Sequence, residues 1–259
     1  MLWEQNNMPE AVIKLDSVWK KFKLAEEDLS ILKGINLEIM PGSFATIMGP
    51  SGSGKSTLMY LLGLLDTPTE GRILLNGQDV SHFSEDRLAQ VRGQKIGFIF
   101  QQFNLLQNLT ALENVMLPMI FQGISEQQRI ERAKMLLDTV NLEHRINHKP
   151  KEMSGGEQQR IAIARSLVNN PEILIADEPT GNLDSTNGKI VMEILAKLHR
   201  EQGKTIVVVT HDPTIAHYSQ NIIHIQDGKI VSNHFQDTDV LWKENGKDIP
   251  DIPPSEIKI

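Results

Sequence analysis

The sequence predicts an α/β fold built around a mainly parallel sheet. Two apolar runs, residues 173–176 (ILIA) and 205–209 (TIVVV), support this prediction. Strands covered by helices on both faces have such near-continuous apolar runs, because neither face meets water. A connecting helix between the runs is predicted by apolar residues at helical spacing, namely Ile190, Val191, Ile194, Leu195 and Leu198.

The N-terminal part predicts short strands joined by tight turns, so we expect an antiparallel β part there. Residues 35–39 and 44–48 have strand character, and residues 72–75 precede Asn76-Gly77, a strong tight-turn signal. A helix after the strand at 44–48 is predicted by leucines at helical spacing, namely Leu58, Leu61, Leu62 and Leu65.

A helical stretch then interrupts the alternation of strands and helices. It follows a short apolar strand at residues 95–100. Apolar periodicity predicts helices over residues 122–142 and from 156 to about 169, and the second helix stops at Asn170-Pro171. We therefore expect residues 102–169 to form an inserted α-helical subdomain.

The chain ends in a predicted hairpin and a polar segment. Asp227-Gly228 predicts the hairpin turn, and residues 236–259 are polar and contain three prolines, so we expect a tail of low order. Residues 1–10 are expected to be a flexible N-terminus. One domain then covers residues 11–235, with a core formed by residues 11–101 and 170–235.

Composition excludes several classes of function. The chain has 259 residues and no cysteine, which excludes disulfides and thiolate-bound metals. A net charge of -7 leaves no basic excess to neutralise nucleic-acid phosphates, so we expect no nucleic-acid partner. No stretch approaches the roughly 18 apolar residues of a membrane span, so we expect any membrane role to go through a partner protein.

A glycine-rich run connects the strand at 44–48 to the helix that follows. Gly49-x4-Gly54-Lys55-Ser56 matches the phosphate-loop pattern, in which glycines let backbone N–H groups converge on nucleotide phosphates. Lys55 should reach the β- and γ-phosphates, and the Ser56 hydroxyl should bind Mg²⁺. The rival dinucleotide-binding fingerprint fails, because Thr57 stands where its third glycine belongs.

Two carboxylates follow the apolar run at residues 173–176. Asp177 and Glu178 stand at the carboxyl end of a predicted buried strand, the sheet edge where ligands of open α/β folds bind. Asp177 is placed to hold Mg²⁺ near Ser56. Glu178 is placed to act as general base on the attacking water.

Further motifs follow in a fixed order along the chain. They are Ser154-Gly155-Gly156-Glu157-Gln158, residues 177–184 (DEPTGNLD) and His211 in residues 208–212 (VVTHD). With the phosphate loop, these motifs resemble the nucleotide-binding subunits of ABC transporters over about residues 13–231. The resemblance implies a P-loop NTPase core of RecA-like type.

Three runs resemble one branch of that family more closely. They are residues 96–106 (IGFIFQQFNLL), 109–115 (LTALENV) and 180–185 (TGNLDS). They look like the ATPases of lipoprotein-releasing and macrolide-export type transporters, a branch that includes cell-division relatives. Glu157 stands where the wider family often has Gln, and the branch accepts Glu there.

The resemblance implies that two copies of the chain sandwich two ATP molecules head to tail. It assigns nucleotide binding to Phe22, Gly49, Pro50, Ser51, Gly52, Ser53, Gly54, Lys55, Ser56, Thr57, Asp177, Ser154, Gly155, Gly156, Glu157 and Asp184. It assigns catalysis to Glu178, His211 and Gln101, and Mg²⁺ binding to Ser56, Gln101 and Asp177.

Alternatives remain open at three of these positions. Ser154 would grip the γ-phosphate bound to the opposite subunit, or would simply cap a helix. Phe22 would stack on adenine, with Trp19 as the competing ring and a place in the core as the plain alternative. Gln101 is preferred to the adjacent Gln102, because Gln101 directly follows the apolar strand.

We also expect a separate transmembrane permease to dock near residues 103–123. Apolar residues are many there for a surface loop, namely Leu105, Leu106, Leu109, Met116, Leu117, Met119, Ile120 and Phe121. The chain would then lie peripherally on the cytoplasmic face of the inner membrane.

Three functions compete, and the first two share every residue named above. In the first, ATP drives export or release of a substrate through the permease, with a lipoprotein, macrolide or peptide as the type of cargo. In the second, it powers a membrane signalling complex for cell-wall remodelling or drug sensing, and no substrate moves. The third, a soluble ABC ATPase acting on DNA or ribosomes, needs two motif sets or a long coiled-coil insertion, and the sequence has neither. The branch resemblance favours transport.

Overall fold

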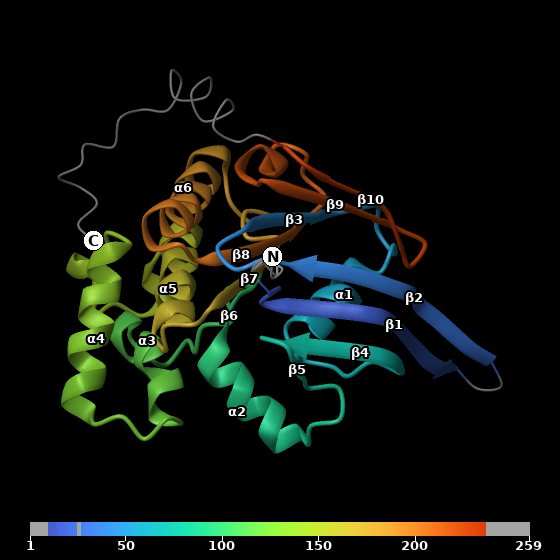
Figure 1. Cartoon of the computed structure of the whole chain (residues 1–259). Coiled ribbons are helices and arrows are strands. Elements are labelled where there is room, and N and C mark those ends of the chain that lie inside the picture. Colours follow the sequence, from blue (N-terminus) through green and yellow to red (C-terminus); the bar gives the residue numbers. More distant parts are fainter. Residues whose placement is uncertain (1–9, 25–26, 237–259) are drawn as a thin grey trace, which may run out of the picture.

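Two sheets face each other across one helix, and further helices cover the outer face of the larger sheet (Figure 1). The computed structural model describes residues 10–24 and 27–236. The expectations for residues 1–9 and 237–259 lie outside the described residues. Gln236, the first residue of the predicted tail, is hydrogen-bonded through its side-chain amide to the carbonyl oxygens of Ala216 and Ser219.

The larger sheet has six strands in the order β10-β9-β3-β8-β7-β6. They are β3 (Phe44–Met48), β6 (Ile96–Ile99), β7 (Ile173–Asp177), β8 (Thr205–Thr210), β9 (Asn221–Gln226) and β10 (Lys229–Phe235). The five strands from β9 to β6 run parallel, and β10 pairs antiparallel with β9 through the predicted hairpin. The mainly parallel sheet predicted from the two apolar runs is therefore confirmed.

The second sheet is antiparallel and has the order β2-β1-β4-β5. Its strands are β1 (Ile13–Leu24), β2 (Glu27–Ile39), β4 (Glu70–Leu75) and β5 (Gln78–Asp79). β2 begins well before the strand predicted at residues 35–39, because its first half also pairs with β1. Asn76 and Gly77 have φ of 48° and 75°, as a tight hairpin turn between β4 and β5 requires.

Helix α1 (Lys55–Leu62) fills the space between the two sheets. Leu58, Leu61 and Leu62 are buried in a cluster that draws residues from both sheets. Leu65 was predicted to continue this face, but the helix ends at Gly63 and Leu65 is 39% exposed. The larger sheet contributes alternate residues to this cluster, such as Ile173 and Ile175 of β7, because side chains alternate along a strand.

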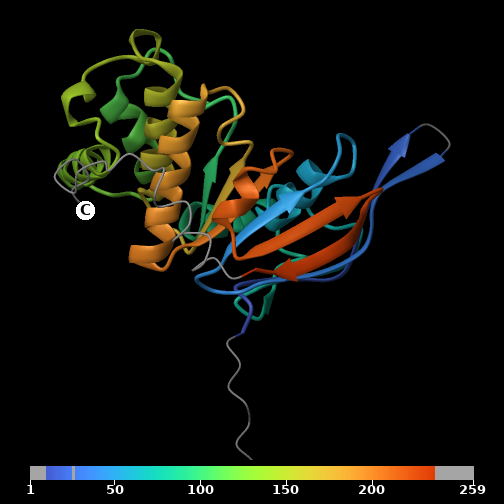
Figure 2. The same cartoon turned by 90° about the horizontal axis from the view of Figure 1, so that it is seen from above.

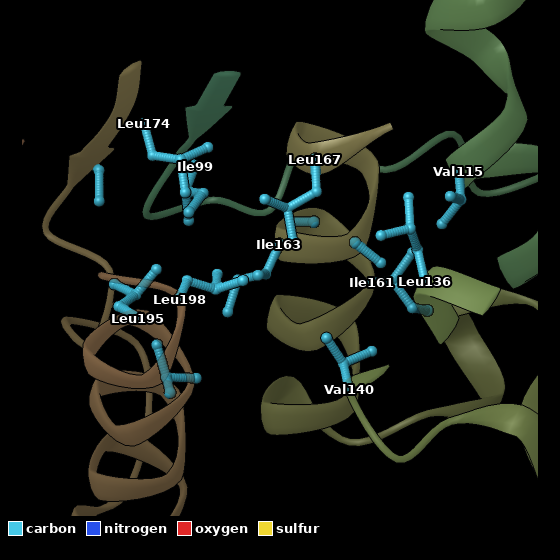
Figure 3. Close-up of a cluster of buried hydrophobic side chains, with 14 of the residues drawn as sticks. Ile99, Val115, Leu136, Val140, Ile161, Ile163, Leu167, Leu174, Leu195 and Leu198 are labelled. Atoms are coloured by element: carbon cyan, nitrogen blue, oxygen red, sulfur yellow. The ribbon is translucent and has the colours of Figure 1, made fainter. Parts of the chain in front are cut away.

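The opposite face of the larger sheet is covered by α5 (Gly155–Leu167) and α6 (Ser185–Gln202). Figure 3 shows α5 between two groups of side chains. Ile163 and Leu167 point toward Ile99 and Leu174 of the sheet, whereas Ile161 points toward the helices beyond. The helical region and the sheet therefore share one hydrophobic cluster through α5.

Beyond α5 lie α3 (Ala111–Ile120) and α4 (Glu126–Thr139), which form the far end of the molecule (Figure 2). The helix predicted over residues 122–142 begins four residues later, at Glu126. Gly123 has φ of 71° and separates the two helices, and Ser125 is the N-cap residue of α4. The predicted helical insertion is observed, but its domain boundaries stay a prediction.

Two helices were not predicted from the sequence. α2 (Glu85–Lys95) buries only Leu88, so its sequence has no apolar periodicity. α3 lies in the segment that was treated as a surface loop, and its buried residues Ala111, Val115 and Met119 explain part of that segment's apolar character. Three short 3₁₀ helices complete the structure, Glu143–Arg145, Pro150–Glu152 and Ile215–Tyr218. Within the described residues, no helix has the length and apolar character needed to cross a membrane.

The loop before α3 is held by Asn114, a fully buried polar residue. Its Oδ1 accepts a hydrogen bond from the N–H of Leu106 at 2.8 Å. Its Nδ2 lies within 3.0–3.2 Å of the carbonyl oxygens of Leu106, Leu109 and Thr110. One side chain therefore ties together the backbone of Leu106, Leu109 and Thr110.

We expect Asn114→Ala to lower the free energy of unfolding by about 2–3 kcal/mol, because it leaves buried backbone groups of the loop without partners. Denaturant unfolding of the purified chain measures the change. Asn108→Ala, an exposed amide in the same loop, is the control and should change stability by less than about 0.5 kcal/mol. Equal effects of the two substitutions would contradict the role of Asn114.

Candidate functional site

The parallel sheet brings the predicted catalytic segments to one edge. Because β3, β8, β7 and β6 are neighbours and run parallel, their carboxyl ends meet at the same side of the sheet. The residues that follow these ends are Gly49 after β3, His211 after β8, Glu178 after β7 and, two positions beyond the end of β6, Gln101. The predicted site residues of the core are thus gathered by topology alone.

The phosphate loop wraps the first turn of α1. Lys55 folds over the loop, and its Nζ donates hydrogen bonds to the carbonyl oxygens of Gly49 and Pro50 at 2.8 and 2.9 Å. A Cβ at Gly49 would lie 2.1 Å from the carbonyl oxygen of Ile225, so only glycine fits against β9. Ser56, in the first turn of α1, is exposed. The loop therefore holds a positive charge beside a helix N-terminus, an arrangement that suits phosphate.

Asp177 and Glu178 have different surroundings although they are adjacent. Burial raises the pKa of the Asp177 carboxyl, the charge of Glu178 raises this pKa further, and Lys55 opposes the shift. Asp177 therefore lies in a place where a cation would stabilise its charge. Glu178 has φ of 42°, a left-handed conformation that is strained for a residue with a side chain.

The Glu178 carboxylate is fixed by the end of β8. Its Oε2 accepts a hydrogen bond from the hydroxyl of Thr210 at 2.8 Å. Its Oε1 accepts from the backbone N–H of His211 at 3.1 Å and lies 2.6 Å from His211 Nδ1. The imidazole of His211 is itself 73% exposed, so its other nitrogen faces outward from this pair. The arrangement orients a carboxylate base and an imidazole together.

Gln101 contacts the segment that follows Glu178. Its Nε2 lies 3.4 Å from Asn182 Oδ1, and Asn182 Nδ2 donates to the carbonyl oxygen of Gln101 at 2.9 Å. Gln102 is exposed. These contacts favour Gln101 over Gln102 as the residue of the site. The catalytic and Mg²⁺-binding roles of Gln101 stay predictions.

Ser154 is the N-cap residue of α5 and forms a capping box with Glu157. The N–H of Glu157 donates to Ser154 Oγ at 3.2 Å, and the N–H of Ser154 donates to Glu157 Oε2 at 2.8 Å. The helix cap that the sequence left open as an alternative is present. Ser154 itself is exposed, and contact of its hydroxyl with a phosphate of the opposite copy stays a prediction.

Glu157 is engaged within its own chain. Its Oε1 accepts a hydrogen bond from Arg145 Nε at 3.2 Å. Burial raises the pKa of Glu157, but the hydrogen bonds from Ser154 and the charge of Arg145 outweigh burial and lower it. The side chain is only 16% exposed. A direct contact of Glu157 with nucleotide stays a prediction, and its observed contacts position Ser154.

Asp184 starts the neighbouring helix α6. Its carboxylate accepts from the N–H and the side-chain amide of Asn187 at 2.9 and 2.6 Å, and the backbone N–H of Asn187 lowers the pKa of Asp184. A Cβ at Gly156 would lie 2.1 Å from Asn187 Oδ1, so glycine lets α5 approach α6 here. The segments of Ser154 and Asp184 therefore lie side by side on one surface.

Phe22 is 43% exposed in β1, which excludes the plain reading as a core residue. Lys20 Nζ lies 5.2 Å from the centre of its ring. Trp19 is half-buried, and a Cβ at Gly34 would lie 3.4 Å from its ring nitrogen. Phe22 therefore offers the more accessible ring, and its stacking on adenine stays a prediction.

Four residues that contact the site were not singled out from the sequence. They are Asn182 beside Gln101, Thr210 beside Glu178, Gln159, whose Nε2 donates to the carbonyl oxygen of Pro179 at 2.8 Å, and Arg165, described below. Gln159 is fully buried. Thr210 lies within the run at residues 208–212 and Gln159 directly follows Ser154-Gly155-Gly156-Glu157-Gln158, so their sequence signal was their place in or beside a motif.

Comparison with known proteins agrees with this geometry. A family model described as ABC transporter matches residues 32–181, which is more than half of the chain. The chain is 51% identical over 223 residues to an uncharacterized ABC transporter ATP-binding protein of Methanocaldococcus jannaschii, MJ0796. That match covers 85% of this chain and 95% of the other.

Two further matches extend the comparison. The Macrolide export ATP-binding/permease protein MacB of Bdellovibrio bacteriovorus is 52% identical over 224 residues, which are 86% of this chain and 34% of that protein. A solved dimeric structure of MJ0796, in a post-hydrolysis state bound to ADP and Pi, has a TM-score of 0.80 and 48% identity. It covers 86% of this chain and 98% of that one.

We expect Thr210→Val to lower kcat for ATP hydrolysis about tenfold and to leave KM for ATP within about twofold, because the change removes only the hydroxyl that orients Glu178. Steady-state ATPase assays measure both constants. Thr46→Val is the matched control, since Thr46 is also fully buried in a neighbouring strand and its Oγ1 has no hydrogen-bond partner among the described residues. The idea fails if both variants hydrolyse ATP at the same rate.

Proposed function

The chain belongs to the ABC transporter family, as an ATP-binding and ATP-hydrolysing subunit, and we propose that it works as a homodimer that drives a separate membrane permease. The observation that carries this proposal is the placement of two groups of residues. The phosphate loop, Glu178 and His211 share one sheet edge, whereas Ser154 and Asp184 share a surface formed by the starts of α5 and α6.

A head-to-tail dimer gives the second group a role. The Ser154 hydroxyl, together with the N–H groups at the start of α5, would bind the γ-phosphate held by the opposite copy. Asp184 would lie beside it at the same interface. Because both copies are identical, a twofold axis would complete two sites at once. Dimeric structures of the related MJ0796 cassette support this assembly.

The residues present fit Mg²⁺ as a further ligand. Asp177 and Ser56 supply the hard oxygen atoms that this ion prefers, and the raised pKa of Asp177 reflects a carboxylate that lacks a nearby cation strong enough to offset burial. When bound, the ion would neutralise charge that develops on the phosphates.

In the hydrolytic step, Glu178 would accept a proton from the attacking water. Thr210 and the N–H of His211 hold the carboxylate oxygens for this purpose. The His211 imidazole would contact the γ-phosphate, and Lys55 would exchange its contacts with loop carbonyls for the β- and γ-phosphates. Gln101 would touch the ion or the water from the other side.

We place the permease contact at residues 103–123 and the groove beside them. The groove has a volume of about 300 Å³ and is lined by Phe98, Phe100 and Pro118 among others. Next to it, Leu106, Ile120 and Phe121 are 53%, 47% and 85% exposed. Apolar side chains exposed in this number suit the insertion of a short helix from the partner. Leu105 and Met119 of the same segment belong to the core.

We further propose a peripheral position on the cytoplasmic face of the inner membrane, reached through the permease. Export or release of a lipoprotein, macrolide or peptide substrate is the favoured output. The identity with proteins named as macrolide export ATP-binding/permease proteins supports it. Power for a membrane signalling complex, with no substrate moved, is the alternative, and the permease that binds the groove distinguishes the two.

We expect Glu178→Gln to bind ATP and to form a stable dimer, because the variant loses the base and keeps the phosphate site. Hydrolysis should fall at least about 100-fold. Size-exclusion chromatography with and without ATP measures the dimer, and Glu126→Gln, an exposed acid at the start of α4, is the control. Hydrolysis at the parent rate would show that Glu178 is not the base, and a chain that stays monomeric would contradict the sandwich dimer.

We expect Phe121→Ser to reduce capture of the permease when tagged Glu178→Gln protein with ATP is purified from detergent-solubilised membranes. The large exposed ring would be lost from the docking surface, whereas Met135→Ser removes an apolar side chain that is 51% exposed on α4, outside that surface. Mass spectrometry identifies and quantifies the captured protein. A permease with few spans and a large extracytoplasmic domain supports export or release. Equal capture by both variants contradicts the docking site.

A further inference from the structure

Two consecutive residues after Gln101 have strained backbones. Phe103 and Asn104 have φ of 48° and 50°, so both lie in the left-handed region, and neither is glycine. Such conformations persist only where the surrounding structure holds them. They lie two and three positions beyond Gln101, so they set the direction in which the chain leaves this residue.

Arg165 holds both strained residues from helix α5. Its Nη1 donates to the carbonyl oxygen of Asn104 at 2.5 Å, and its Nη2 donates to the carbonyl oxygen of Phe103 at 2.7 Å. The planar guanidinium suits two adjacent acceptors, whereas a lysine ammonium is a single point charge on a flexible stem. Partial burial lowers the pKa of Arg165.

Hydrogen bonds from Asn182 and from Arg165 limit how far the backbone at and after Gln101 can move. Asn182 holds the Gln101 carbonyl oxygen on the side of Glu178. Arg165 holds the chain two and three residues further on. A Cβ at Gly181 would lie 2.7 Å from Gln101 Nε2, so the amide is also packed closely. Gln101 therefore occupies a narrow range of positions as long as Arg165 keeps its two contacts.

Arg165 also belongs to helix α5 and to the lining of the groove. It lies near the end of the helix that Ser154 begins, and that helix is clamped between the sheet and α3 and α4 (Figure 3). Its side chain also lines the groove of about 300 Å³, together with Phe100, Asn104 and Pro118. A partner segment in the groove would touch the arginine and one of the two residues it holds.

We propose that Arg165 is a positioning residue for Gln101, which it orients through the strained turn of Phe103 and Asn104. The inference rests on the catalytic role of Gln101 in the proposed function. Arg165 does not itself touch the phosphates. It holds the strained turn that orients Gln101 through two hydrogen bonds to backbone carbonyl oxygens. Loss of these hydrogen bonds would free the turn, whereas helix α5 would keep its fold.

A double-mutant cycle tests the inference. Arg165→Lys and Gln101→Ala should each lower kcat for ATP hydrolysis about tenfold with KM for ATP within about twofold, and the double variant should be no slower than Gln101→Ala alone. Steady-state ATPase assays measure both constants. Arg129→Lys is the matched control, because Arg129 Nη1 also donates to a backbone carbonyl, that of Ile124, away from the strand ends.

The outcomes are distinguishable. A double variant slowed by the product of the two single effects overturns the inference, because a structural arginine would act equally with or without Gln101. A Gln101→Ala variant with full activity sinks both the proposed role of Gln101 and the inference that depends on it.

Hydrogen exchange of the full chain tests the contact of Arg165 with Phe103 and Asn104 without relying on activity. Arg165→Lys should speed exchange of the amides at residues 101–105 and leave residues 106–110, which Asn114 holds, unchanged. Unchanged exchange at residues 101–105 overturns the inference whatever the kinetics show.

Discussion

The rest of the structure depends on one helix that is buried on two sides. α5 packs Ile163 and Leu167 toward the sheet and Ile161 toward α3 and α4, so it belongs to the core and to the helical region at once. Its first residue is preceded by Ser154, and its buried polar residues reach the loops after β6 and β7. A shift of α5 cannot leave these loops unchanged, because close-packed interiors transmit displacement.

Strain at the strand ends is balanced by contacts from distant segments. Glu178 has φ of 42° and is held by Thr210 and His211, while Phe103 and Asn104 have similar φ and are held by Arg165. Extended or helical backbone would cost less, so these conformations persist because several hydrogen bonds favour them together. Both strained turns flank residues proposed to meet the attacking water. The strain therefore lies where small displacements matter most for hydrolysis.

Local motifs made the fold class predictable from the sequence, and they named most of the residues that the structure gathers at the strand ends. The phosphate loop and the Asp177-Glu178 pair depend on neighbours in the chain, and the parallel sheet follows from apolar runs. Arg165, Thr210 and Asn182 were missed because their partners lie 61–62, 32 and 81 residues away. α2 was missed for another reason: a helix that buries a single leucine leaves no periodic signal.

A homodimer of this chain would place α5 between two nucleotide sites. Ser154 at one end would serve the phosphate of the opposite copy, whereas Gln159 and Arg165 further along contact the loops of Glu178 and Gln101 in the same copy. Closure on ATP in one site would then bear on the other through a single rigid element. Binding free energies couple reciprocally. A partner segment that favours the position of α5 in the closed dimer would therefore favour ATP-driven closure, and closure would in turn increase the affinity of the chain for that partner.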